Sequence, residues 1–334
     1  MSLEESIDRN LHTRACELFR IRHPIVLGGM GSATSPELVA AVSNAGGLGT
    51  LGLSGRGREE VGRSIEQIRS LTSQPFGVNF LLFRVDDAAV EAALAARPPV
   101  VTFAWAWPEQ DLKPYVERAH AAGAIVTYMV SNVPDAVRAV EAGVDGIIAQ
   151  GSEGGGHVGL MGTVALVPMV VTAVAPVPVL AAGGIADGRG LAAALALGAD
   201  GVLLGTRFLA THESPLHPNF KQAIVDSDGH DTVLTTVPDV ISGSVWPGAL
   251  SRTQWNAVLA EWSGRENELR RNRQTIAQNV ATARAAGDPV HTPLLFGQDA
   301  GLIDQVLPVR EVIESMITEA RLVINERLAE IIGH

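Results

Sequence analysis

A strand-like pattern that returns eight times along the chain limits the possible folds more than any other feature. In the stretches AVEAGVDGIIAQ and AALALGADGVLLG, a helical segment ends at a glycine and an apolar run follows. Such runs begin about 25 residues apart, the length that a strand, a helix and two short loops need. They are almost continuously apolar, as expected of strands covered on both faces. We predict parallel strands over residues 24–27, 48–53, 76–80, 100–104, 125–130, 144–150, 178–182 and 201–205.

Helical segments with recognisable ends separate these runs. Ser35, Asn132 and Asp187 are capping residues that each open a helix. Gly143 and Gly198 close the last two of these three segments. A strand–helix unit repeated eight times predicts an α/β fold, the (β/α)8 or TIM barrel. An open, doubly wound sheet shares the local pattern and is the alternative.

The pattern changes after the eighth strand. Residues 213–295 contain helical stretches, above all over residues 255–286, and no clear strand, so we expect a mostly helical insertion. A closing helix follows over residues 308–332, with apolar residues on one side that suit packing against the barrel. We therefore divide the chain into a barrel over residues 1–212, the insertion over 213–295 and a C-terminal segment over 296–334. The insertion is either a lid over the site or a contact between subunits.

Composition excludes several classes of protein. The formal net charge of −11 argues against binding to nucleic acid or to an anionic membrane, since both favour basic patches. Cys16 is the only cysteine, so we expect no intrachain disulfide and no metal site. The first residues do not resemble a signal peptide, and prolines interrupt the apolar runs, so we expect a cytoplasmic protein. The oligomeric state stays open, a homodimer included.

Glycines at the ends of the last two strands predict a phosphate site. The active site of a TIM barrel lies at the C-terminal ends of the strands, and the last two loops often hold a phosphate. Glycine lets backbone N–H groups approach an anion, and the helix that opens at Asp187 would point its positive end at it. Turn geometry is the alternative for any one of these glycines. These strand ends carry Ala182, Gly183 and Gly184 after the seventh strand and Gly205 and Thr206 after the eighth.

Two earlier strands also end in residues suited to a ligand. The first strand ends in Gly28, Gly29, Met30 and Gly31, a run against which a flat group can lie. The third carries Asn79, whose amide both donates and accepts hydrogen bonds. A buried asparagine that caps a loop is the alternative for this position.

The most informative segment follows the sixth strand and reads QGSEGGGHVG. Its His157 stands among glycines at a strand end, where an imidazole can reach the barrel axis and transfer protons near neutral pH. A purely structural histidine is the alternative. Glu153 is placed to orient His157, to cap the loop or to face solvent. The chain has no HExxH, GxxxxGK[ST] or GxSxG motif, so zinc-peptidase, P-loop and serine-hydrolase chemistry find no support.

With these segments identified, the sequence resembles the nitronate monooxygenase family and the related FMN-dependent enoyl-acyl-carrier-protein reductases II. The resemblance spans nearly the whole chain. It rests on HPIVLGGM, LVAAVSNAGGLGTLG, PFGVNF, QGSEGGGHVG, AAGGIADGRG, LGTRF and FGQDAGLID, in that order. It implies a TIM barrel that binds FMN non-covalently and oxidises alkyl nitronates with O2 to a carbonyl compound and nitrite.

The resemblance also implies roles for particular residues. His157 corresponds to the active-site histidine of the family. The FMN phosphate would lie on the glycines that end the seventh and eighth strands and on Thr206. The ring and ribityl chain would lie against the remaining residues of the mouth. These are Gly29, Met30, Gly31, Asn79, Gln150, Gly155 and Gly156.

One departure from the family leaves the reaction open. Many relatives carry a lysine near the end of the fifth strand, where this chain has Met129, so a cation beside the flavin is missing. The alternative reaction is NAD(P)H-dependent reduction of a quinone or an enoyl thioester. A flavin-binding protein without turnover and a phosphosugar-binding barrel without flavin are two further alternatives.

Overall fold

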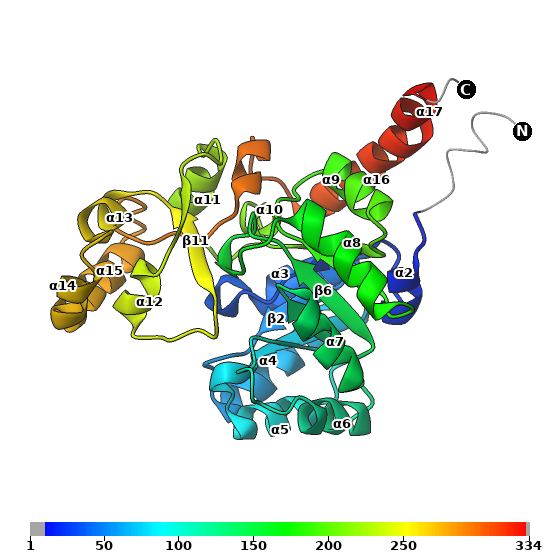
Figure 1. Ribbon diagram of the computed structural model, residues 1–334, viewed down its shortest axis with the longest axis horizontal. Coiled ribbons are helices and arrows are strands. Elements are labelled where there is room, and N and C mark those ends of the chain that lie inside the picture. The colour runs from blue at the N-terminus through cyan, green and yellow to red at the C-terminus, as the bar shows by residue number, and fades with distance from the viewer. Residues whose placement is uncertain (1–10, 332–334) are drawn as a thin grey trace, which may run out of the picture.

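Eight parallel strands form a barrel, as the sequence predicts (Figure 1). The structure is a computed structural model and describes residues 11–331. Neighbouring strands pair in the order β1-β9-β8-β6-β5-β4-β3-β2, and the Leu27 N–H completes the ring by donating to the Leu48 carbonyl at 2.9 Å. The strands are β1 (Ile25–Leu27), β2 (Gly49–Gly52), β3 (Phe76–Leu81), β4 (Val100–Ala104), β5 (Ile125–Val130), β6 (Gly146–Gln150), β8 (Val179–Ala182) and β9 (Gly201–Leu204).

Helices alternate with the strands around the outside of the barrel. They begin where the sequence predicts, because Ser35 Oγ accepts from the Leu38 N–H at 3.3 Å and Asn132 Oδ1 from the Asp135 N–H at 2.9 Å. Four of them are followed by a glycine with φ between +84° and +96°, a conformation that glycine adopts without strain. The outer helices are α3 (Pro36–Asn44), α4 (Arg58–Leu71), α5 (Asp87–Ala95), α6 (Lys113–Ala121), α7 (Val133–Glu141), α8 (Thr163–Val174) and α9 (Gly188–Ala196), and short turns η1 (Gly31–Ala33) and η2 (Leu82–Arg84) follow β1 and β3.

The eighth outer helix comes from the end of the chain. Only the short α10 (Thr206–Leu209) follows β9 directly, and α16 (Val309–Leu322) packs against α9 and α3 (Figure 1). The predicted amphipathic pattern is confirmed, because one side of α16 buries Val312, Ile313, Met316, Ile317 and Ala320. A π-helical turn, η4 (Val323–Arg327), and α17 (Leu328–Ile331) continue this helix.

A short helix, α2 (Arg14–Phe19), covers the N-terminal end of the barrel. Its Ala15 and Phe19 pack against side chains inside the barrel, among them Leu48. Arg14 ties the helix down, since its Nε donates to Asp200 Oδ1 at 2.8 Å. The C-terminal ends of the strands are therefore the end of the barrel at which a ligand can enter.

The chain leaves the barrel after Thr211 and returns to it at Leu307, and these two residues form a parallel β-bridge. The His212 N–H donates to the Leu307 carbonyl at 3.1 Å. Between these ends the chain is mostly helical, as predicted (Figure 1). The elements are α11 (Pro218–Val225), β10 (Thr232–Thr235), α12 (Val237–Ser242), β11 (Leu250–Gln254), α13 (Ala257–Trp262), α14 (Glu266–Arg271), α15 (Arg273–Ala285) and η3 (Gln298–Leu302).

The expectation that the insertion has no strand is wrong. β10 and β11 pair antiparallel, and β11 also pairs with β7 (Gly156–Val158), which lies in the loop after β6. The sequences TVLT and LSRTQ mix polar and apolar residues, so their local pattern does not predict strands. They become strands because β7 offers the backbone edge with which β11 pairs.

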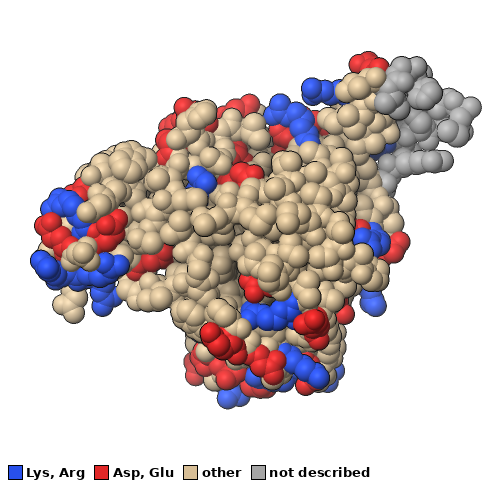
Figure 2. All heavy atoms as spheres, in the orientation of Figure 1, with Lys and Arg blue, Asp and Glu red and all other residues tan. Residues whose placement is uncertain are grey.

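Charged residues are unevenly spread over the face in Figure 2. They gather over α14 and α15 and over α5 and α6, with basic and acidic side chains intermixed. The outer side of α8 and its preceding loop is apolar, with Leu160, Val164 and Met169 exposed by 74%, 72% and 51%. The net negative charge is therefore not gathered into one acidic patch on this face. None of the helices between residues 11 and 331 is long and apolar enough to cross a membrane.

Candidate functional site

The ends of β1, β3 and β9 meet at the C-terminal mouth of the barrel. A Cβ on Gly29 would lie 2.5 Å from the Cβ of Asn79, and a Cβ on Gly205 would lie 3.2 Å from Met30 Sδ. Glycine is thus the residue that fits at Gly29, because the Asn79 side chain occupies the place of a Cβ. Gly31 has φ +56°, and its Cβ position faces open space. The structure brings these predicted residues together.

The ends of β6 and β8 also meet. Gly183 and Gly184 have φ of +95° and +75°, so a side chain at either position would strain the turn. A Cβ on Gly184 would lie 3.1 Å from the Cβ of Glu153, and one on Gly183 would lie 2.8 Å from the Gly151 carbonyl oxygen. Ala182 precedes the turn and is buried inside the barrel. This turn is packed against the loop that carries the histidine.

Two carboxylates lie at the N-terminus of α9 and accept from two of its first amides. Asp187 Oδ1 accepts from the Gly190 N–H at 3.0 Å, and Glu319 Oε2 accepts from the Gly188 N–H at 2.7 Å. Two carboxylates therefore offset the positive end of this helix. Whether α9 also points this end at a phosphate stays a prediction.

Gln150, the last residue of β6, carries an unsatisfied acceptor. Its Oε1 is buried and has no hydrogen-bond partner among residues 11–331. Such an atom is costly unless a ligand or water donates to it. Asn79, by contrast, already donates from Nδ2 to the Thr102 carbonyl at 3.3 Å. Gln150 is therefore the stronger candidate for a polar contact with a bound group.

The loop after β6 is held in place from several sides. The carboxylate of Glu153 accepts from the Thr163 N–H at 2.9 Å and so caps the start of α8. Of the roles considered for Glu153, capping is the observed one, and the carboxylate does not orient His157. Arg252 Nε donates to the Ser152 carbonyl at 2.8 Å and joins the loop to β11.

The two glycines before His157 have different surroundings. A Cβ on Gly155 would lie 2.5 Å from Phe296 Cα, so glycine is required there because another backbone segment passes beside it. Gly156 has φ +74°, and nothing lies within 4 Å of its Cβ position. Of the two, Gly156 is the one with open space beside its backbone.

A carboxylate from the insertion holds His157. The Nε2 of His157 lies 2.7 Å from Asp239 Oδ1 and 3.0 Å from Ser251 Oγ. Ser251 Oγ also donates to Asp239 Oδ2 at 3.2 Å, and the His157 and Asp239 side chains are only 14% and 12% exposed. An ionised carboxylate only accepts hydrogen bonds, so we assign the proton to Nε2. Nδ1 is then the nitrogen that is left to accept a proton.

An indole fixes the plane of the imidazole. The ring centroids of Trp246 and His157 are 3.4 Å apart, and the ring planes differ by 11°. Trp246 also contacts Trp105 at a centroid distance of 6.0 Å and Phe83 at 4.5 Å. Because Trp105 and Phe83 follow β4 and β3, these contacts join His157 to the mouth of the barrel.

A buried acid lies behind the end of β9. Thr206 Oγ1 accepts from the Gly297 N–H at 2.9 Å, and Asp299 follows in the same segment. Burial raises the pKa of Asp299 to about 7, although the Thr206 hydroxyl and the Arg207 charge act to lower it. Its Oδ1 has no hydrogen-bond partner among the described residues. A carboxylic acid with a raised pKa therefore lies beside Thr206, one of the residues assigned to a phosphate.

Several residues of this site escaped the sequence analysis. Asp239 and Ser251 come from the insertion, far from His157 in sequence, and no local signal marks them. The two tryptophans in AWAWP, by contrast, follow the predicted fourth strand directly and could have been assigned to the mouth. Asp299 lies in FGQDAGLID, which carries the family resemblance without indicating a buried acid.

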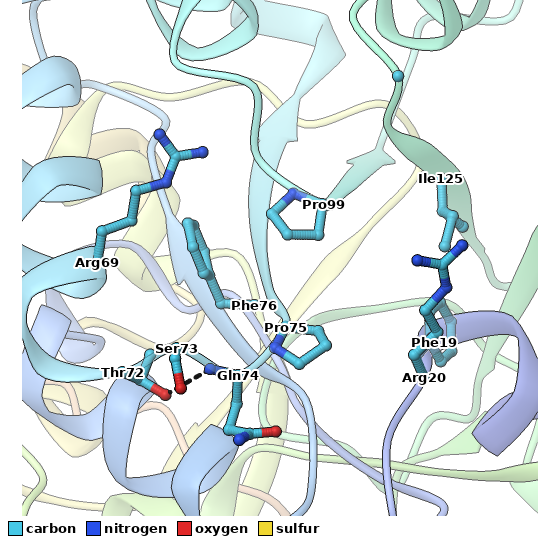
Figure 3. Close-up of a pocket in the computed structure, with 11 residues that line it drawn as sticks. Phe19, Arg20, Arg69, Thr72, Ser73, Gln74, Pro75, Phe76, Pro99 and Ile125 are labelled. Carbon is cyan, nitrogen blue, oxygen red and sulfur yellow. Dashed lines mark hydrogen bonds between the residues drawn. The ribbon is translucent and has the colours of Figure 1, made fainter.

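A hollow of about 560 Å³ lies at the opposite end of the barrel (Figure 3). Its lining includes Phe19, Phe76 and Pro99, with Arg20 and Arg69 on opposite sides. None of the candidate site residues lines it. In this fold the chemistry belongs to the other end of the strands, so we do not assign the active site here.

Comparison with known proteins agrees with this architecture. The family model described as nitronate monooxygenase matches residues 12–89 and 82–319. The (3aS,4S,5R,7aS)-5-hydroxy-7a-methyl-1-oxo-octahydro-1H-indene-4-carboxyl-CoA dehydrogenase of Mycobacterium tuberculosis is 34% identical over 345 residues, covering 93% of this chain and 96% of its own. FabK from Thermotoga maritima is 36% identical with a TM-score of 0.85, and the match covers 96% of this chain and 99% of that one. A nitroalkane oxidase from Streptomyces ansochromogenes is 28% identical with a TM-score of 0.81, covering 94% and 100%.

The raised pKa of Asp299 predicts a pH dependence of stability. The folded carboxyl stays protonated up to about pH 7, whereas the unfolded one ionises near 3.8. The stability linked to this group is therefore fully present below about pH 4 and is lost as the pH rises through about 7. Asp299→Asn removes this loss. The free energy of unfolding of the variant, relative to that of the unchanged protein, should therefore increase by about 2–3 kcal/mol from pH 5 to pH 8.

Urea unfolding of both proteins at several pH values measures this difference. Asp226→Asn changes an exposed aspartate and is the matched control. The difference between its free energy of unfolding and that of the unchanged protein should not vary with pH. If the free energies of unfolding of Asp299→Asn and the unchanged protein differ by the same amount at pH 5 and pH 8, the buried carboxyl does not titrate in this range.

Proposed function

The chain belongs to the nitronate monooxygenase family, and from this we propose that it is a flavin-dependent oxidoreductase that oxidises nitronates with O2. The observation that supports this most is the histidine at the barrel mouth. His157 has one ring nitrogen fixed by Asp239 at 2.7 Å and the other left for a proton. A proton-transfer group with this arrangement stands where a TIM barrel carries out its chemistry.

The residues of the mouth suit FMN. Gln150 Oε1 is a buried acceptor that needs a donor, and the flavin ring and ribityl chain offer N–H and O–H groups. Gly31 and Gly156 have open space at their Cβ positions, so a flat group can approach their backbone closely. Gly183, Gly184, Gly205 and Thr206 would hold the phosphate. When bound, the flavin takes up the electrons that the substrate gives up.

His157 would hold and move the proton of the substrate. Its Nδ1 can accept a proton from the carbon next to a nitro group, which gives the nitronate. The positive charge that forms on the imidazole is stabilised by Asp239 through the Nε2–H bond. Trp246, stacked on the ring, prevents the imidazole from turning away. These contacts keep one nitrogen in one place throughout the reaction.

The insertion would contribute to this chemistry directly. We propose that residues 213–295 form part of the active site, because they supply Asp239, Trp246 and Ser251. A role confined to subunit contact would not require a buried carboxylate paired with the histidine. A lid or a subunit contact is compatible with this role.

A second candidate is a flavin-dependent reductase or dehydrogenase that exchanges electrons with NAD(P)H and acts on a quinone or thioester. Met129 favours it, because this position of β5 packs with apolar side chains in the barrel interior and brings no cation to the site. The dehydrogenase relative, named for a carboxyl-CoA substrate, also fits this candidate. In this reaction His157 would give a proton to the reduced substrate.

An anaerobic visible spectrum distinguishes the two candidates. The purified protein should show oxidised-flavin bands, and propyl-2-nitronate alone should diminish them because the substrate supplies the electrons. Loss of the bands only after NAD(P)H is added would favour the second candidate. A colourless protein that takes up no added FMN would contradict both candidates.

Removal of the imidazole should slow turnover and leave the cofactor bound. We expect His157→Ala to lower kcat by about 10²–10⁴-fold, the range for a positioned acid–base group. His120→Ala is the matched control, because His120 also lies 2.9 Å from an aspartate, Asp145, but on the outside of the barrel. Unchanged kinetics in His157→Ala, measured with full flavin content, would exclude a catalytic role for His157.

Removal of the charge on Asp239 should affect catalysis through His157. Asp239→Asn keeps an acceptor for Nε2–H but no longer stabilises the imidazolium, so kcat should fall by about 10–100-fold while KM changes little. Asp145→Asn, in the pair outside the barrel, is the control. If kcat of Asp239→Asn stays unchanged while only the free energy of unfolding falls, Asp239 has a structural role alone.

A further inference from the structure

Four aromatic side chains form one surface beside His157. We call Phe83, Trp105, Trp107 and Trp246 the aromatic wall. Trp246 meets Phe83 at a centroid distance of 4.5 Å and Trp105 edge-to-face at 6.0 Å, and Phe83 meets Trp107 edge-to-face at 6.3 Å. The wall starts at the imidazole, because Trp246 is stacked on it at 3.4 Å. It therefore continues the candidate active site toward solvent.

The wall is rigid, and its geometry strains the backbone. Trp105 has φ +55°, an uncommon and costly conformation for a bulky residue. The Phe83 N–H donates to the Trp105 carbonyl at 2.9 Å, and the Ala106 N–H donates to the Tyr128 hydroxyl at 3.0 Å. Trp107 Nε1 donates to the Phe83 carbonyl at 3.3 Å. The fold thus holds these rings in place at an energetic cost, as proteins often do at functional sites.

The wall is also exceptional for this chain. The whole sequence has five Trp, two Tyr and eight Phe among 334 residues, and four of them meet here. They are not simply core, because Trp107 is 39% exposed and the neighbouring Val245 is 71% exposed. A rigid aromatic surface that stays accessible beside a reactive histidine is suited to contact a substrate.

We propose that the substrate carries a planar, apolar ring system that lies on the aromatic wall, with its reacting carbon near His157. This assignment rests on the proposed function, since it concerns the same site. Fixed aromatic rings favour a planar ring because it can stack or meet their edges without losing internal freedom. A three-carbon nitronate would leave the wall uncovered, and a flexible alkyl chain would lose conformational entropy on it.

Two carboxylates of similar apolar size test this inference. Naphthalene-2-carboxylate is planar and decanoate is flexible, and both are titrated into the purified protein by calorimetry, with no turnover required. We expect the planar ligand to bind about ten-fold more tightly. Trp246→Ala and Trp105→Ala should each weaken its binding by about 3–10-fold and leave decanoate binding nearly unchanged.

Two variants are needed because Trp246→Ala also removes a contact of His157, whereas no ring contact joins Trp105 to the imidazole. Trp255→Ala, an exposed tryptophan outside the wall, is the control and should bind both ligands as the unchanged protein does. Equal affinity for the two ligands, absence of binding, or wall variants that bind naphthalene-2-carboxylate normally would each overturn the inference.

Failure of this inference is distinct from failure of the proposed function. A flavin-containing protein that reacts with nitronate but does not prefer the planar ligand would refute only the ring-bearing substrate. If the protein is colourless but its wall variants lose affinity for the planar ligand, the aromatic wall remains a binding surface and the flavin chemistry is refuted.

Discussion

The antiparallel pairing of β7 with β11 is the contact on which the candidate site depends. β7 is a three-residue strand in a glycine-rich loop, and alone it would have no fixed position. Pairing with β11 sets His157 opposite Ser251 and brings the insertion over the barrel mouth. Asp239 then reaches Nε2 at 2.7 Å, and Trp246 covers the ring. One short stretch of backbone hydrogen bonds thus joins two parts of the chain into one site.

The barrel contributes the other half of the site, namely the glycines at the ends of its strands. Its glycines lie where parallel strand ends come close together, and several positions have no room for a Cβ. Glycine at these positions lets segments of the protein pack closely, and the open space lies beside Gly31 and Gly156. The positive end of α9, which would be the simplest anion site, is offset by Asp187 and Glu319.

Relatives with different names share this architecture, which is typical of TIM barrels, because loops at the mouth vary while the barrel is retained. The dehydrogenase, FabK and the nitroalkane oxidase all match more than nine-tenths of the chain. What distinguishes such enzymes is expected in the residues around the histidine. Here these are the aromatic wall, the carboxylate partner of His157 and the uncharged Met129.

The sequence by itself determined the barrel, most strand positions, the helix caps and the glycine loop with His157, because each depends on short-range propensity and periodicity. The tertiary structure alone decided the partners of His157. Asp239 and Trp246 lie some eighty to ninety residues away and stand in short, mixed segments without a clear period. It also decided that Glu153 caps α8 and that Glu319 accepts from the first amide of α9, since competing donors and acceptors meet only after folding. Local patterns fix elements, but which side chains share a hydrogen bond is set by long-range packing.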